Sequence, residues 1–119
     1  MRDPGVFLED MVGACERIIS FARGVGDDEL MDEDKPFRGA VLLQLLILGE
    51  AAKNVPDEWK ARHMDIPWAR IAGMRDVVAH YYFGVEDSMV VAAIRVDVPA
   101  VLPRLREILA RIDERYPQP

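Results

Sequence analysis

The chain has 119 residues, of which half are hydrophobic and 30% are charged, and its formal net charge at pH 7 is −6. This size and composition fit one globular domain covering residues 1–119, and they exclude an intrinsically disordered chain. The acidic balance argues against broad, non-specific binding of nucleic acid, although it leaves room for a local basic site or a basic partner.

The sequence predicts no membrane span and no secretory signal. The longest apolar run, from Ala40 to Gly49, is interrupted by Gln44 and is too short to cross a bilayer. The N-terminal residues lack the apolar core of a signal peptide. A single cysteine, Cys15, excludes an intramolecular disulfide and suits a reducing compartment. We therefore expect a cytoplasmic protein without membrane contact, in which Cys15 packs in the core.

The first helix is expected to begin at Asp3 and Pro4, an N-cap followed by proline at the first helical position. Apolar residues then recur at helical spacing as far as Ala22, and Gly24 marks the end of the helix. Residues 27–35 are acidic and lack apolar periodicity, so they are expected to form a loop with a frayed turn.

The second helix is expected to run from Pro36 to about Val55. Residues 41–48 are apolar nearly all round, which is typical of a helix that is covered on most sides. A small domain does not easily cover every face of a helix, so we expect a second subunit to bury part of this surface. Glu50 follows among apolar neighbours, and we expect its carboxylate to pair with Arg75. Loss of that partner would leave a buried charge, at a cost of several kcal/mol.

A short helical turn is predicted over residues 57–63, because Pro56 ends the second helix. His63 lies among charged residues and is expected to be solvated. Trp68 is expected to open the next helix as a core anchor.

The last helical region is expected to begin at Glu86 or Asp87. Pro99 and Pro103 do not both fit an undisturbed helix, so we expect it either to kink or to restart at a cap formed by Asp97. The last four residues, from 116 onwards, are expected to fray.

The segment from Gly73 to Tyr82 concentrates the residue types that carry chemistry. Arg75 has a planar fork of donors that matches phosphate geometry, and His80 can transfer a proton near neutral pH. Together they suggest chemistry on a phosphodiester. An arginine, a histidine and a tyrosine are also common at the surface of an amphipathic helix, so this spacing alone does not establish catalysis.

Helical geometry places these side chains relative to one another. Arg75 and Tyr82 are seven residues apart and lie almost in line, whereas His80 is displaced from Arg75 by roughly 140°. His80 therefore points away from the apolar stripe, toward solvent or toward a second subunit. Asp76 precedes His80 by four residues, at a spacing that allows it to orient the imidazole or raise its pKa.

The pattern Arg75-x4-His80-x-Tyr82 resembles the signature of HEPN-domain ribonucleases, in particular the HepT-like toxin family. The resemblance extends over nearly the whole chain, in ordered blocks at residues 48–53, 66–68, 73–76, 82–85 and 97–99. Two departures stand out: Asp76 occupies a position where many members have Asn, and residues 89–91 lack a Trp that is often found there.

The expected fold is all-α. No segment alternates apolar and polar residues as a strand does, and four principal helices with short connections favour an antiparallel four-helix bundle. The bundle is expected to be HEPN-like, with a short extra helical turn and a kinked or split last helix.

The resemblance implies a metal-independent endoribonuclease that acts on RNA at a composite site in a homodimer. Arg75 and His80 of both chains would be catalytic, with Asp76 and Glu50 in supporting roles, and the products would carry 2′,3′-cyclic phosphates. It also implies a toxin whose partner, a minimal nucleotidyltransferase antitoxin, attaches AMP to Tyr82. No cofactor and no metal ligands are expected.

Two other hypotheses remain open at this point. The chain is alternatively a binding module in which Arg75, His80 and Tyr82 recognise a nucleotidyltransferase and the acidic surface serves a basic partner. The third possibility is a nuclease-inactive nucleotide-binding helical domain. Cleavage of RNA by the purified protein, compared with His80→Ala, separates the first hypothesis from the other two.

Overall fold

The computed structural model describes residues 3–80 and 86–115, with the side chains of residues 77, 80 and 113–115 excepted. All regular secondary structure in these residues is helical. The elements are α1 (Pro4–Ala22), α2 (Asp27–Leu30), α3 (Phe37–Asn54), α4 (Asp57–Arg62), α5 (Trp68–His80), α6 (Asp87–Ala92), the π-helical turn η1 (Ala93–Asp97) and α7 (Val98–Arg115). The predicted all-α, HEPN-like helical bundle is confirmed.

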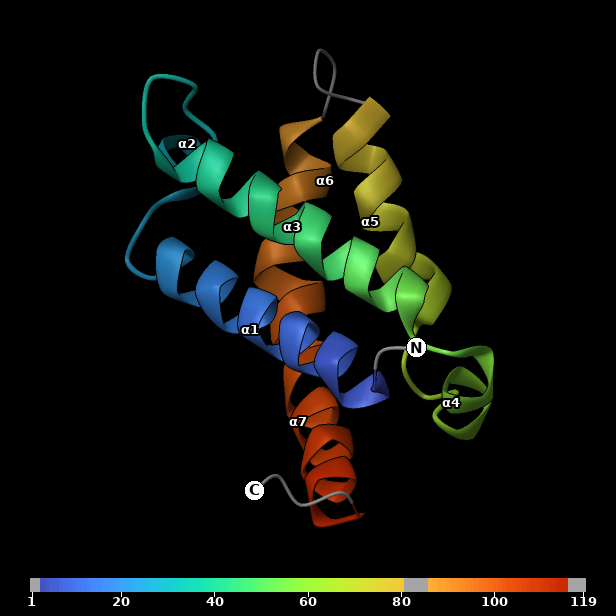
Figure 1. Cartoon of the computed structure of the whole chain (residues 1–119). Coiled ribbons are helices and arrows are strands. Elements are labelled where there is room, and N and C mark those ends of the chain that lie inside the picture. Colours follow the sequence, from blue (N-terminus) through green and yellow to red (C-terminus); the bar gives the residue numbers. More distant parts are fainter. Residues whose placement is uncertain (1–2, 81–85, 116–119) are drawn as a thin grey trace.

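The bundle is made up of the helices α1, α3 and α5 and the continuous helical segment α6–η1–α7 (Figure 1). α1 and α3 lie side by side and run in opposite directions, α6–η1–α7 passes behind them, and α5 packs on α3. The core between these helices consists of apolar side chains that are almost completely shielded from solvent. The largest of these are Leu8, Met11, Ile18, Leu30, Leu48, Ile94, Leu105 and Ile108.

The first helix begins and ends where its sequence predicts. The Asp3 carboxylate accepts a hydrogen bond of 2.9 Å from the Gly5 amide, and Pro4 occupies the first helical position. The helix ends at Ala22, and Gly24 follows with a φ of 75°, a conformation that glycine adopts without steric cost.

The segment predicted to be a loop contains the short helix α2. Its one buried residue, Leu30, is completely shielded, and Met31 beside it is also buried. Two adjacent apolar residues are too few to produce a helical period, so periodicity did not identify this anchor.

The disturbance predicted in the last helical region is present as the π-helical turn η1. Pro99 has no N–H to donate, and its ring crowds the carbonyl four residues earlier. The wider π-helical turn directly before Pro99 accommodates both the missing hydrogen bond and the bulk of the ring. The Val98 amide accordingly bonds to the Ala93 carbonyl, five residues back. α7 follows this turn without a break, and the carboxylate of Asp97 pairs with Arg70 of α5 at 3.0 Å.

Arg95, in the π-helical turn, connects the helical segment α6–η1–α7 to the end of α1. Its guanidinium donates to the carbonyls of Ala22, at 2.8 Å, and Val25, and Nε lies 3.0 Å from the Asp27 carboxylate. These carbonyls follow the C-terminal end of a helix, where backbone acceptors lack helical partners.

The predicted anchor role of Trp68 is confirmed, whereas the prediction for His63 is wrong. Trp68 is buried at the start of α5, and its Nε1 donates to the His63 carbonyl at 2.9 Å. The His63 ring is half-buried and stacks on Trp59, with ring centroids 6.0 Å apart. Its Nδ1 atom is buried and has no hydrogen-bond partner among the described residues.

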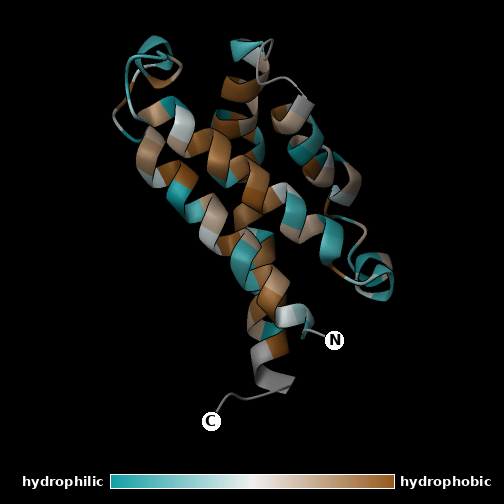
Figure 2. Cartoon of the chain, turned by 45° about the horizontal axis from the view of Figure 1, so that its top comes forward, coloured by the Kyte–Doolittle hydropathy of each residue, from teal (hydrophilic) through white to brown (hydrophobic). Residues whose placement is uncertain are grey.

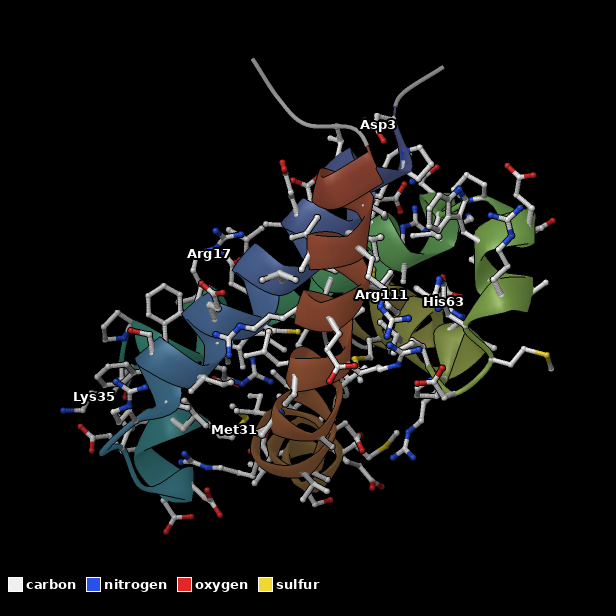
Figure 3. All side chains as sticks on the ribbon, turned by 90° about the horizontal axis from the view of Figure 1, so that it is seen from below. Asp3, Arg17, Met31, Lys35, His63 and Arg111 are labelled. Atoms are coloured by element: carbon white, nitrogen blue, oxygen red, sulfur yellow. The ribbon has the colours of Figure 1, made fainter. Side chains whose placement is uncertain are left out.

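The surroundings of His63 disfavour its charged form. Burial, followed by the nearby guanidinium of Arg104, lowers the pKa of His63 below its ordinary value of 6.5; the Asp65 carboxylate opposes this shift, and Arg111 and Arg62 add smaller lowering contributions. Figure 3 shows Arg111 of α7 on the side of that helix that faces His63, at the end of α4. The positively charged neighbours were not visible in the sequence, because Arg104 and Arg111 belong to a distant helix.

Among the described residues, no helix combines the length and the hydropathy that a bilayer span requires.

His63 should make the stability of the fold depend on pH. A histidine whose pKa is lowered by folding contributes stability that is complete above its unfolded pKa of about 6.5 and is lost as the pH falls toward the folded pKa. We expect the Tm of the wild type to fall between about pH 7.5 and about pH 5.5 more steeply than that of His63→Gln. Thermal melts followed by circular dichroism measure both slopes. The second histidine, His80, is common to both proteins, so parallel slopes would contradict the role of His63.

Candidate functional site

The candidate site lies where α5 crosses the C-terminal half of α3. The backbone of α5 comes so close to Gly49 of α3 that a Cβ atom at residue 49 would lie 2.6 Å from the Arg75 amide nitrogen. It would lie 2.8 Å from the Cβ atom of Arg75. Contacts this short do not occur between real side chains and a neighbouring backbone, so this crossing requires glycine at residue 49.

The Arg75 guanidinium is held by two carboxylates. Its Nε atom pairs with the carboxylate of Glu50, the residue that follows Gly49, so the contact expected from the sequence is present. Its Nη1 atom lies 3.4 Å from the carboxylate of Asp76. Glu50 is itself steadied by Asn54, whose side-chain amide donates to the Glu50 carbonyl at 2.9 Å and lies 3.5 Å from its carboxylate.

The pair between Glu50 and Arg75 is more exposed than the sequence suggested. The side chains of Arg75 and Glu50 retain 37% and 50% of their exposure, respectively. Water therefore screens both charges, and such a pair contributes about 0–1 kcal/mol rather than the several kcal/mol expected for a buried one. The pair orients the guanidinium, and it leaves the Nη2 atom without a hydrogen bond or ion pair within the described part of the chain.

His80 is the last residue of α5, five positions after Arg75. The position of its backbone on the helix is described, but its side chain, and with it the expected contact to Asp76, lies outside the described residues. Tyr82, the expected acceptor of AMP, also lies outside them. The structure therefore brings together Arg75, Glu50 and Asp76.

An apolar groove lies beside this site, between α3 and α5. It encloses a cavity of roughly 400 Å³ and is lined by Arg38, Gly39, Leu42, Leu43, Leu46, Val78 and Ala79. Leu43 has 54% of its surface exposed, which is unusual for a leucine in the middle of a long helix. The groove lies on the part of α3 that is apolar nearly all round, shown largely brown in Figure 2, and it reaches Ala79, directly before His80.

Cys15 does not contribute reactive chemistry. Its side chain is completely shielded in the core, and burial raises the pKa of its thiol to about 12, so the thiol stays neutral near pH 7. The packing role expected for Cys15 is confirmed. Among the described residues, no three His, Cys, Asp or Glu side chains are grouped so that they could hold a metal ion.

Comparisons with known proteins place the chain in a family. Residues 11–112 match the profile of the family described as "Ribonuclease HepT-like". A protein of Thermococcus cleftensis named "Probable ribonuclease HepT" is 35% identical over 102 residues, which are 86% of this chain and 92% of that protein. No solved structure matches.

Two further relatives carry provisional names as RNases. One, from Caldanaerobacter subterraneus subsp. tengcongensis, is 34% identical over 93% of this chain and 98% of its own length. The other, from Methanocaldococcus jannaschii, is 30% identical over 96% of this chain and 97% of its own length. With the profile matching most of the chain and the relatives aligned over nearly their whole lengths, the chain belongs to the HepT-like ribonuclease family.

Proposed function

We propose that this protein is a metal-independent endoribonuclease whose active site is shared by two copies of the chain. The observation that carries the proposal is the Arg75 guanidinium, which is fixed at Nε by Glu50 yet remains more than a third exposed on the helix that ends in His80. A cation held in this way can receive a phosphate with its remaining donors. Family membership and the names of the relatives support RNA as the substrate.

RNA supplies its own nucleophile in this reaction. His80 of one copy takes the proton of a 2′-hydroxyl, the 2′-oxygen attacks the adjacent phosphorus, and the bond from phosphorus to the 5′-oxygen breaks. His80 of the other copy donates a proton to the leaving oxygen. The products are a 2′,3′-cyclic phosphate and a 5′-hydroxyl. Arg75 stabilises the charge that develops on the phosphorane.

The apolar groove supports the proposal of a shared site. It is lined by the exposed Leu43 and by Ala79, which directly precedes His80, so a second copy seated there would bring two motif helices together. The motif provides only His80 and Arg75 in each chain, whereas the reaction needs a base, an acid and a group that stabilises charge. A twofold dimer supplies two copies of each motif residue.

Family membership further supports a role as the toxin of a toxin–antitoxin pair. In this role a minimal nucleotidyltransferase is the antitoxin, and it silences the nuclease by attaching AMP to Tyr82. The Tyr82 hydroxyl attacks the α-phosphorus of ATP, pyrophosphate leaves, and the proton passes to solvent. The new phosphate sits two residues beyond His80, where it competes for the cation that RNA phosphate needs.

The first test is cleavage of RNA by the purified, partner-free protein. We expect His80→Ala to lower the rate by about 10²- to 10⁴-fold and Arg75→Ala by about 10²- to 10³-fold, with the fold intact. Arg75→Lys should rescue poorly, because an ammonium does not reproduce a bidentate phosphate contact. Gel assays with end-group analysis of the products give rates and identify the cyclic phosphate.

Arg70→Ala is the matched control, since Arg70 lies on the same helix and pairs with Asp97 away from Glu50. It should cleave like the wild type. Wild-type rates in His80→Ala or Arg75→Ala would refute the assignment of the site. A wild-type protein that binds a nucleotidyltransferase but never cleaves RNA would instead indicate a binding module.

The second test concerns the dimer. We expect Leu43→Glu to give monomers and to abolish cleavage, because a carboxylate buried without a partner in the groove costs several kcal/mol. Sedimentation at micromolar concentration measures the mass. Met64→Glu is the control, because Met64 is an apolar residue with 82% exposure outside the groove, and it should leave the dimer intact. An active wild-type monomer would remove the shared-site mechanism.

The third test concerns the control of activity. Incubation with the cognate nucleotidyltransferase, ATP and magnesium should add AMP to the peptide that contains Tyr82 and silence cleavage. Tyr82→Phe should escape both effects, whereas Tyr81→Phe, the neighbouring control, should still be modified. Peptide mass spectrometry locates the modification. Neutralisation of Tyr82→Phe at the wild-type rate would show that the control mechanism is wrong.

A further inference from the structure

We propose that Gly49 is a positioning residue for Arg75: the absence of a side chain at residue 49 sets the place of the α5 backbone from which the Arg75 guanidinium reaches the substrate. This inference rests on the proposed RNA cleavage, because its value to the protein is the placement of a phosphate-binding cation. The contact between α3 and α5, on which the inference is based, is independent of the reaction.

The contact is specific to Gly49 and Arg75. The three atoms nearest to a Cβ at residue 49 all belong to Arg75: the amide nitrogen at 2.6 Å, Cβ at 2.8 Å and Cα at 3.1 Å. A flexible side-chain tip can rotate away from an added methyl group, but a helical backbone cannot. Any side chain at residue 49 would therefore push α5 outward at the residue that carries the guanidinium.

Two other glycines of the same two helices, Gly39 and Gly73, do not share this requirement. A Cβ at Gly39 of α3 or at Gly73 of α5 would meet nothing within 4 Å. Glycine weakens a helix relative to alanine, so a glycine in a helix needs a reason. The close approach of Arg75 supplies that reason at Gly49.

The support of α5 near Arg75 comes from α3, and the ion pair between Arg70 of α5 and Asp97 lies five residues before Arg75. Among the described residues, α5 packs chiefly against α3. Gly49 sets the distance of the Arg75 backbone from α3, and Glu50, the next residue, holds the far end of the same side chain at Nε. Two consecutive residues of α3 thus contact the backbone and the guanidinium of Arg75, and Asp76 contacts the guanidinium at Nη1. Moving the backbone while Glu50 stays in place changes the direction of the guanidinium.

The effect on the reaction should appear in the chemical step. A displacement of about 1 Å at a positioned group costs about 100-fold in rate, because the reacting geometry is lost. We expect Gly49→Ala to lower kcat for RNA cleavage by about 10- to 100-fold and to change KM less. Gly73→Ala, the same substitution two residues from Arg75 where space is open, should cleave like the wild type.

A second measurement reports on Arg75 without any reaction. The Nε–H resonance of Arg75, assigned in a nitrogen-15 spectrum by its loss in Arg75→Lys, senses the ion pair with Glu50. Gly49→Ala should shift this resonance or broaden it by solvent exchange, while the circular dichroism spectrum remains helical. Gly73→Ala should leave the resonance unchanged. If Gly49→Ala alone does not fold, both measurements are made with Gly49→Ala added to the stabilised Gly73→Ala protein.

Each outcome decides the inference. A shifted resonance together with a lowered kcat supports it. An unchanged resonance, or a shifted resonance with a wild-type kcat, overturns it. If the wild type does not cleave RNA, the proposed function fails, and the resonance alone then decides whether Gly49 positions Arg75.

Discussion

The close approach of two helices at Gly49 and Arg75 is the constraint on which the candidate site depends. α5 rests chiefly on α3, and at this crossing the backbone of one helix fits directly against the other because residue 49 has no side chain. The guanidinium is then oriented by Glu50, which is exposed enough that the pair adds little stability. The site is thus placed by steric contact and oriented by charge, and these are separable contributions.

Three sides of α3 face apolar surroundings or an open apolar groove, which explains why the helix is apolar nearly all round. Val41, Leu45 and Leu48 are buried in the core. Gly49 and Glu50 meet α5, and Leu43 faces the open groove. A helix that packs against other helices on two sides and presents an apolar third side is suited to an assembly in which a second copy covers that side.

The described side chains of the site carry one positive and two negative charges, so the site is not positively charged overall. Arg75 lies beside two carboxylates, and the chain as a whole carries −6. Long-range attraction therefore contributes little to RNA binding, and affinity depends on short-range contacts with phosphate.

The fold could be predicted largely from the sequence because its determinants are local. The Asp3 cap with Pro4, the helical period of the apolar residues and the proline that follows the π-helical turn each act within one or two turns of their own helix. The pairing of Glu50 with Arg75 was also predicted, since an isolated carboxylate on a mainly apolar helix requires a partner. The side chain of His80 and the whole of Tyr82 lie outside the described residues, so their predicted roles stay predictions.

The sequence by itself determined the bounds of the long helices α1 and α3 and identified Arg75, His80 and Tyr82 as the candidate residues for chemistry. Only the tertiary structure decided that Glu50 and Arg75 pair in partial contact with water, that His63 is half-buried, and that Gly49, unlike Gly73, has no room for a side chain. The physical reason is that each of these properties depends on which faces of distant helices meet and how closely. Periodicity along one helix identifies its apolar face but contains no information on that distance.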